Sequence, residues 1–146
     1  VMDRYQQAMR SHANCMVCGI DNQSALGIGF HQTGEHSTEG VFLTDERYQG
    51  YTGILHGGMT STLLDAVMTH CLLQQGIKGL TAELTIRFVV PINIGSKIYL
   101  SAQIVDQRHG IHRLNAVASV DGVVVAKASA KFIEKKVNDR SFINEE

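Results

Sequence analysis

The sequence predicts an α+β domain in which a curved antiparallel sheet wraps one long, buried helix. Three observations carry this prediction. The segment from Gly57 to about Gln75 is helical in type and apolar around most of its circumference. In the second half of the chain, apolar and polar residues alternate in one segment after another, as in strands with one covered face. No helical segment separates these strands, which excludes a doubly wound parallel sheet.

Length and composition are those of one domain. Of the 146 residues, 44% are hydrophobic, which suffices for one core without disulfides or metal. We expect residues 1–146 to form that domain, with the segment 1–25 and the tail 134–146 at its periphery. The 13 basic and 14 acidic side chains are mixed along the chain, so no block of one charge attracts nucleic acid or an acidic membrane. Without a membrane-spanning stretch or an apolar leader, a cytoplasmic protein is expected.

Shorter elements are expected before the long helix. Residues from about Asp3 to Ser11 have the composition of a short helix. Two short strands are then expected, at Gly27 to Gln32 and at Thr38 to Leu43. A turn-rich connection typical of a hairpin joins them. Thr44 to Leu55, rich in glycine and polar residues, is expected to be a loop.

Long antiparallel strands are expected after the helix, each with one covered face. The many alanines on that face indicate a sheet that closely approaches something bulky, and the long helix is the bulky element available. The covered residues are Ala82, Leu84, Ile86, Phe88 and Val90; then Ile98, Leu100, Ala102 and Ile104; then Leu114, Ala116, Ala118 and Val120; and finally Val124, Ala126, Ala128, Ala130 and Phe132.

The cysteines argue against a disulfide framework because there are three of them. Cys15 and Cys18 form a Cys-x-x-Cys-Gly unit that follows His12, which is half of a zinc knuckle. A four-ligand site needs a second pair, for which the chain offers Cys71 and scattered histidines. The sequence therefore favours two small apolar side chains in a turn closed by Gly19, with no metal.

One polar stripe interrupts the apolar surface of the long helix. Ser61, Thr62, Asp65 and Thr69 recur at three- and four-residue spacing. A carboxylate inside an apolar helix is costly to desolvate unless it is hydrogen-bonded or borders a wet cavity, and such groups often serve functional sites. Asp65 is therefore the candidate catalytic carboxylate. The alternative is a structural aspartate that Ser61, Thr62 or Thr69 satisfies.

The start of the long helix is a second candidate for chemistry. Unpaired N–H groups and a partial positive charge at Gly57 and Gly58 would let a ligand oxygen approach the backbone, although two glycines also suit a tight turn. His56 is a candidate general acid or base, or a support for the turn. A general base or nucleophile beside an oxyanion-binding helix end is the minimum set of groups needed to hydrolyse an acyl ester or thioester. No Gly-x-Ser-x-Gly elbow is present, and a thiol at Cys71 inside the apolar helix would be inert.

A family resemblance covers the chain from about Cys15 to Phe132. The run Gly53-Ile54-Leu55-His56-Gly57-Gly58-Met59, with Leu64-Asp65 ending nine residues after the histidine, resembles the signature of hotdog-fold thioesterases of the phenylacetate-pathway type. The Cys-x-x-Cys-Gly turn, followed by Asn22 and Leu26-Gly27, resembles a subgroup of them.

The resemblance implies a homodimer with joined sheets, or a dimer of such dimers, and active sites at the subunit interface. It implies that Asp65 activates water or attacks the thioester, that the Gly57 N–H of the facing subunit polarises the carbonyl, and that Thr81 orients the water. Some relatives carry Asn or Gln at the position of Gly50, so neighbouring Gln49 is the substitute expected to contact substrate. For the CoA phosphates the basic candidates are Arg87, Arg108, His109 and Arg113.

The sequence thus predicts an acyl-CoA or aroyl-CoA thioesterase that uses no cofactor. An acyl-CoA-binding or sensing module of the same fold would keep the pocket but would not need Asp65. A hydratase or dehydratase fits the spacing of the motif poorly, because its chemistry pairs a histidine with an acid in another arrangement. A purely structural dimer would leave the polar stripe on the helix unexplained.

Overall fold

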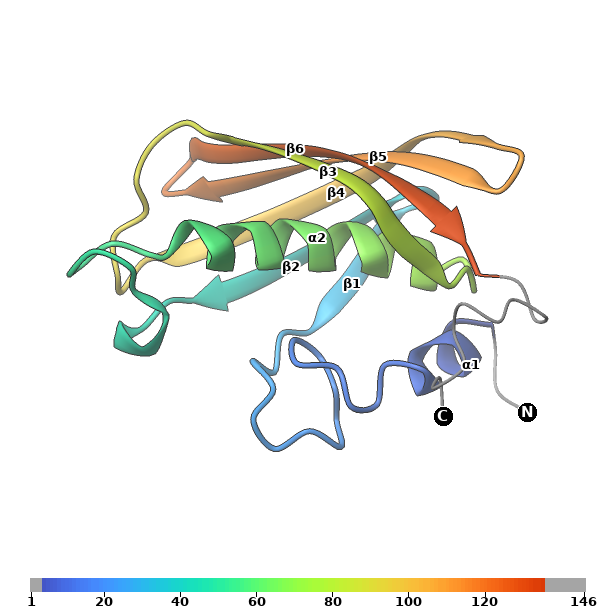
Figure 1. Ribbon diagram of the computed structural model, residues 1–146, viewed down its shortest axis with the longest axis horizontal. Coiled ribbons are helices and arrows are strands. Elements are labelled where there is room, and N and C mark those ends of the chain that lie inside the picture. Colours follow the sequence, from blue (N-terminus) through green and yellow to red (C-terminus); the bar gives the residue numbers. More distant parts are fainter. Residues whose placement is uncertain (1–3, 136–146) are drawn as a thin grey trace.

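The computed structural model describes residues 4–135, in which a six-stranded antiparallel sheet curves around the helix α2, Gly57–Leu73 (Figure 1). The sheet order is β1-β2-β4-β5-β6-β3. The strands are β1 Phe30–Gly34, β2 Ser37–Leu43, β3 Gly79–Phe88, β4 Lys97–Arg108, β5 Ile111–Val120 and β6 Val123–Glu134. The predicted fold class, a long central helix wrapped by a curved antiparallel sheet, is confirmed.

The helix α2 is the centre of the core. It contacts all six strands, and Leu64, Val67, Met68 and Leu72 are fully buried. A helix with apolar residues around most of its circumference gains stability only when it is covered on most sides, which the curvature of the sheet provides. No helix of the described residues is long and apolar enough to cross a membrane.

Alanines line the face of the sheet that lies against α2. Their small side chains let the backbone of the sheet approach the helix closely. One prediction on this face is wrong: Val125, only 4% exposed, is buried in place of Val124. The pairing of β5 with β6 shifts register there, since Ala118 pairs with Ala126 but Ser119 pairs with Val124. This bulge turns Val125 inward.

The elements before α2 follow the expectations with small changes. Helix α1 spans Arg4–Arg10, within the expected range. Strand β1 begins at Phe30 rather than at Gly27, and the expected loop before α2 contains a short 3-10 helix, η1, Glu46–Tyr48. At the other end, β6 includes Glu134, and the rest of the expected tail from residue 136 lies outside the described residues.

Strand β3 is an edge strand and is more exposed than its alternating pattern predicts. Leu84 and Ile86 are half-buried, whereas Ala82 and Val90 are exposed and Phe88 is 57% exposed. The reason is topological, because β6 pairs with one edge of β3 and no other described strand pairs with its second edge. Such an edge offers unpaired backbone groups to another strand.

Candidate active site

The structure brings Asp65 and Thr81 together from two different elements. Asp65 lies in the middle of α2 and Thr81 lies near the start of β3. The Thr81 hydroxyl donates a hydrogen bond of 2.6 Å to Asp65 Oδ1. A short bond from a neutral donor to a carboxylate is one of the stronger side-chain interactions. The carboxylate is thereby held in one orientation while its second oxygen, Oδ2, can contact a ligand.

The other hydroxyls of the polar stripe point elsewhere. Ser61, Thr62 and Thr69 donate to the main-chain oxygens of Gly57, Gly58 and Asp65 at 3.1, 2.9 and 2.9 Å. These are the bonds that serine and threonine commonly make to the preceding helical turn. The alternative of an Asp65 carboxylate satisfied by its helical neighbours therefore does not describe this site.

The surroundings of Asp65 favour its protonated form. Burial raises the pKa of Asp65, while the bond from Thr81 and the charge of His12 oppose that rise. His12, in the loop after α1, is close enough that the charge of Asp65 in turn acts on its pKa, which burial lowers. Sequence reasoning considered His12 only as a metal ligand, because nothing in the linear sequence indicates that this loop folds against the middle of α2.

His56 caps the start of α2 with its side chain. Its backbone is extended, with φ −60° and ψ 133°, and its Nδ1 accepts a hydrogen bond of 2.8 Å from Gly58 N–H. The main-chain oxygen of His56 accepts from Met59 and Thr60. Within residues 4–135, the N–H of Gly57 has no acceptor. Of the two glycine amides that the sequence singles out, Gly57 is thus the one open to a ligand, and His56 occupies the other.

An apolar cavity of about 250 Å³ opens beside this free amide. Gly57 and Thr60 line it from α2, and Phe88 and Val90 line it from the end of β3 and the loop that follows. The remaining lining residues are Ile54, Leu55, Val89, Pro91, Ile92, Val125 and Ala126. A cavity with apolar walls and one main-chain donor at its rim suits an acyl group that ends in a carbonyl oxygen.

Gly57 and Asp65 of one chain lie too far apart to act on one carbonyl. They are eight residues apart on the same helix. With a rise of 1.5 Å per residue, this interval corresponds to about 12 Å. An amide that polarises a carbonyl and a carboxylate that activates water for attack on its carbon must both lie within a few ångströms of the same group. Within one chain, the Gly57 amide and the Asp65 carboxylate therefore cannot reach the same carbonyl group.

The remaining candidate residues lie on the surface. Gln49 Oε1 accepts a hydrogen bond of 3.0 Å from Gly53 N–H. A side chain at Gly50 would crowd His56, because a Cβ there would lie 3.3 Å from His56 Cα. This close approach gives a reason why this chain has glycine at position 50, where some relatives carry Asn or Gln.

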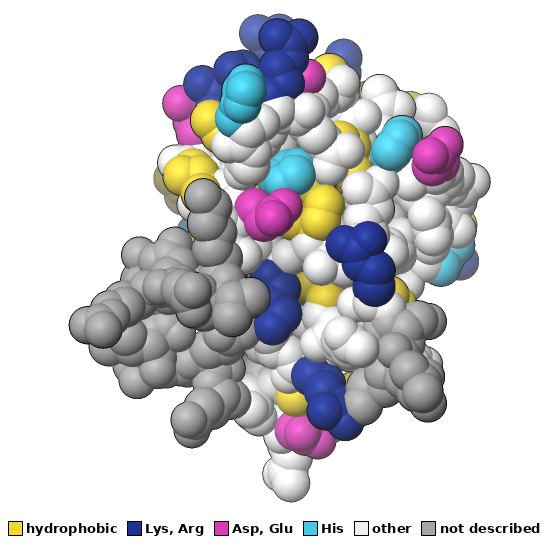
Figure 2. All heavy atoms as spheres, turned by 90° about the vertical axis from the view of Figure 1, so that its right-hand side faces the viewer, with side chains coloured by type: hydrophobic (Ala, Val, Ile, Leu, Met, Phe, Trp, Pro, Cys, Tyr) yellow, Lys and Arg dark blue, Asp and Glu magenta, His cyan; other side chains and the backbone are white. Residues whose placement is uncertain are grey.

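The basic candidates do not form one patch. Arg87 is exposed on β3, and Arg108 and Arg113 both interact with Asp106, at 3.1 and 4.0 Å. His109 is an exposed residue of the β4–β5 turn. Figure 2 shows the lysine and arginine side chains of one face in separate groups, interspersed with histidine and acidic side chains. No group of them converges on the cavity beside Gly57.

Comparisons with known proteins point to one family. Residues 52–115, which include His56, Gly57, Asp65 and Thr81, match the model of the Thioesterase superfamily. The chain is 33% identical over 91 residues to mouse acyl-coenzyme A thioesterase 13, a match that covers 61% of this chain and 61% of the mouse protein. The aligned part thus spans less than two thirds of that relative.

Solved structures share the fold. The PaaI protein of the Escherichia coli phenylacetic acid degradation operon superposes with a TM-score of 0.77 at 20% identity, over 89% of this chain and 95% of that one. The smu.793 protein of Streptococcus mutans, solved with acetyl CoA, superposes with a TM-score of 0.70 at 16% identity, over 74% of this chain and 88% of the other. At these identities the likeness concerns the fold alone.

Proposed function

We propose that this chain is a hotdog-fold member of the Thioesterase superfamily and that it hydrolyses an acyl-CoA or aroyl-CoA thioester to the free acid and CoA, because residues 52–115 match the family model and the fold is that of the PaaI protein. The observation that carries the proposal is the Asp65–Thr81 pair, a half-buried carboxylate held by a hydroxyl at 2.6 Å. Mouse acyl-coenzyme A thioesterase 13 and the acetyl-CoA complex of smu.793 support the choice of CoA thioesters as the substrate class. The cytoplasm, where acyl-CoAs are abundant, is the proposed location.

The active unit is a homodimer with two shared sites. The contacts of β3 support this arrangement, since Thr81 bonds Asp65 near one end of the strand and the ring of Phe88 lies against Gly57 at the other. Antiparallel pairing of two β3 edges, with Thr81 opposite the partner subunit's Phe88, brings Asp65 of one chain beside Gly57 of the other. Each interface then holds two complete centres, related by the two-fold axis. A dimer of such dimers is compatible with the same sites.

Hydrolysis begins with the thioester carbonyl at the helix start. The Gly57 N–H donates to the carbonyl oxygen and stabilises the negative charge that develops there. Asp65 and Thr81 hold a water against the carbonyl carbon, and Asp65 accepts the proton of this water as it attacks. The C–S bond breaks, the carboxylic acid forms, and the proton on Asp65 passes to the CoA sulfur. A carboxylate whose pKa is raised by burial accepts this proton more readily than an ordinary aspartate does.

The other candidate residues take supporting roles. His56 holds Gly58 and thereby orients the first turn of α2, so that the Gly57 amide faces the cavity. Gln49 holds the loop before the helix through Gly53. Gly58, next to Gly57 in the first turn of α2, is proposed to contact the substrate. Arg87 and Arg113, as exposed cations, are the proposed contacts of the CoA phosphates. The reaction uses water and groups of the protein itself.

Release of free thiol from a panel of short, long and aromatic acyl-CoAs tests the proposal. Wild-type protein should turn over at least one member, and Asp65→Asn should lose about two orders of magnitude or more, the scale of a missing general base. Asp121→Asn is the matched control, because Asp121 lies in the β5–β6 turn with a positive φ that asparagine also tolerates. Binding of acyl-CoA without turnover of any member would instead identify a binding or sensing module.

A further inference from the structure

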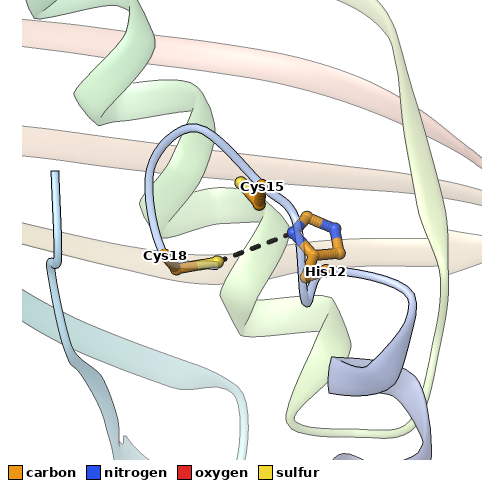
Figure 3. A group of neighbouring side chains, drawn as sticks. All are labelled: His12, Cys15 and Cys18. Atoms are coloured by element: carbon orange, nitrogen blue, oxygen red, sulfur yellow. Dashed lines mark hydrogen bonds between the residues drawn. The ribbon is translucent and has the colours of Figure 1, made fainter. Parts of the chain in front are cut away.

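Three metal-ligating side chains meet in the loop between α1 and β1. The ligand atoms of His12, Cys15 and Cys18 all lie within 4.8 Å of one another. Figure 3 shows the imidazole of His12 turned toward the sulfur of Cys18, in front of α2. The candidate thioesterase chemistry uses neither cysteine, so the cluster is not part of that site.

The spacing of two of these atoms matches a tetrahedral zinc site. Bonds of about 2.3 Å to sulfur and about 2.0 Å to nitrogen at a tetrahedral angle place the two ligand atoms about 3.6 Å apart. The distance from Cys18 Sγ to His12 Nδ1 is 3.7 Å. The two ligands therefore stand at the separation that one shared ion would require.

The backbone of the loop is shaped around the cysteine pair. Gly19 closes the turn through a hydrogen bond of 3.0 Å to Cys15 O, and a Cβ at Gly19 would lie 2.5 Å from Cys15 N. Only glycine fits at this point. In addition, the N–H of Val17 points at Cys15 Sγ from 3.3 Å, an interaction that stabilises a thiolate bound to a metal.

A buried histidine of α2, which lies outside the group of three whose ligand atoms are within 4.8 Å of one another, is the candidate fourth ligand. His70 is 2% exposed, and neither of its ring nitrogens has a hydrogen-bond partner among the described residues. Such an unpaired buried group costs free energy. The rings of His70 and His12 are 6.0 Å apart, near the roughly 5 Å that two imidazoles on one tetrahedral ion span.

We propose that His12, Cys15, Cys18 and His70 bind one zinc ion. Two thiolates and two imidazoles form a Cys2His2 set. Such a set binds zinc in preference to calcium, magnesium or manganese. Four protein ligands leave no open position, so the ion is structural. The proposal departs from the expectation of an apolar turn without metal, because His70 is far from the cysteine pair in the sequence and comes near it only through the fold.

The ion would fasten the loop after α1 to the helix that carries Asp65. His70 lies five residues after Asp65 on α2. The metal thus fixes one wall of the candidate active site without contacting the substrate. This inference does not depend on thioesterase activity, since the ligand set is defined by its own geometry.

Metal content and X-ray absorption of the full chain, purified with a reductant, test the inference. We expect about one zinc per chain, with two sulfur neighbours at about 2.3 Å and two nitrogen neighbours at about 2.0 Å. Cys15→Ser and Cys18→Ser should each weaken zinc binding, measured by chelator competition, by at least the roughly 10- to 100-fold that even outer partners of a metal site contribute. Cys71→Ser is the matched control and should retain the metal, because Cys71 donates to His36 O elsewhere in the core.

Two results would overturn the inference. The first is reduced protein that binds no zinc on reconstitution, which would leave the cysteine pair as a turn or a redox couple. The second is a zinc ion whose absorption spectrum shows fewer than two nitrogen neighbours, which would remove His70 or His12 from the site. Because these measurements use wild-type protein, they remain decisive if a variant fails to fold, and neither outcome bears on thiol release from acyl-CoA.

Discussion

The hydroxyl of Thr81 donates to the carboxylate of Asp65 across 2.6 Å, and so joins the edge strand of the sheet to the middle of the central helix. This bond selects one orientation of the carboxylate. It also works against burial, because it lowers the pKa that desolvation raises.

Replacing Thr81 with valine should therefore slow thiol release and shift its pH dependence. A hydrogen bond to a charged group contributes about 1.5–3 kcal/mol, so the loss in kcat is expected at about 10-fold or more. Without the bond the pKa of Asp65 rises further, and the acid limb of the kcat/KM profile should move to higher pH. Thr81→Ser keeps the donor and should behave like the wild type. Equal profiles for all three proteins would exclude the role of Thr81.

Asp65→Asn should stabilise the fold at neutral and alkaline pH. Burial raises the pKa of Asp65, so the folded carboxyl binds its proton more tightly than the unfolded one. Wild-type protein then loses stability as the pH rises through this elevated pKa, whereas the asparagine variant does not. Thermal melts should give a higher Tm for the variant at pH 8, and the difference should shrink near pH 4. Asp121→Asn, on the surface, should show no such trend. A Tm difference between Asp65→Asn and the wild type that does not change with pH would contradict a raised pKa of Asp65.

The role of the Gly57 amide can be separated from the role of its size. Proline is favoured at the first helical position and replaces the amide hydrogen with a ring carbon, and the extended backbone of His56 suits a following proline. A Cβ at Gly57 would meet Phe88 at 3.5 Å, an ordinary contact. Gly57→Pro and Gly57→Ala should both fold, and by reducing the freedom of the unfolded chain each should add up to about 1 kcal/mol of stability.

Their activities should differ sharply. Gly57→Pro should lose about 10²–10³ in kcat, the effect of removing one oxyanion donor, whereas Gly57→Ala retains the N–H and should keep most of the turnover. If the proline variant is as active as the alanine variant in the thiol-release assay, the amide is not the donor.

Mixed dimers test whether the two halves of a site come from different subunits. Asp65→Asn and Gly57→Pro are each expected to be inactive alone. After unfolding and refolding together, half of the dimers combine the two chains, and each mixed dimer has one intact site, which corresponds to about a quarter of the wild-type activity. No recovery, although mixed dimers are present by mass spectrometry, would place both groups in one chain's own site.

Much of this architecture follows from local patterns in the sequence. The period of two in the later strands and the apolar circumference of α2 predict the helix and the sheet, because both patterns record burial directly. Asp65 was identifiable as the exception within an apolar helix, and the glycines after His56 marked the helix start.

Other features depend on contacts that the linear pattern does not encode. The exposure of β3 reflects its place at the edge of the sheet, which alternation alone cannot distinguish from the centre. The inward turn of Val125 follows from a one-residue bulge against β5. The meeting of His12 with His70 and Asp65 requires the first loop to fold against the helix, an interaction between segments far apart in the chain.

The eight-residue interval between Gly57 and Asp65 has a consequence for how the protein is handled. If α2 contributes to two active sites, a chain separated from its partner holds two incomplete ones. The Gly57 amide at the start of the helix lacks a carboxylate, and the Asp65 carboxylate in its middle lacks an amide. Turnover per chain then depends on total protein concentration, and dilution below the dissociation constant of the dimer abolishes activity.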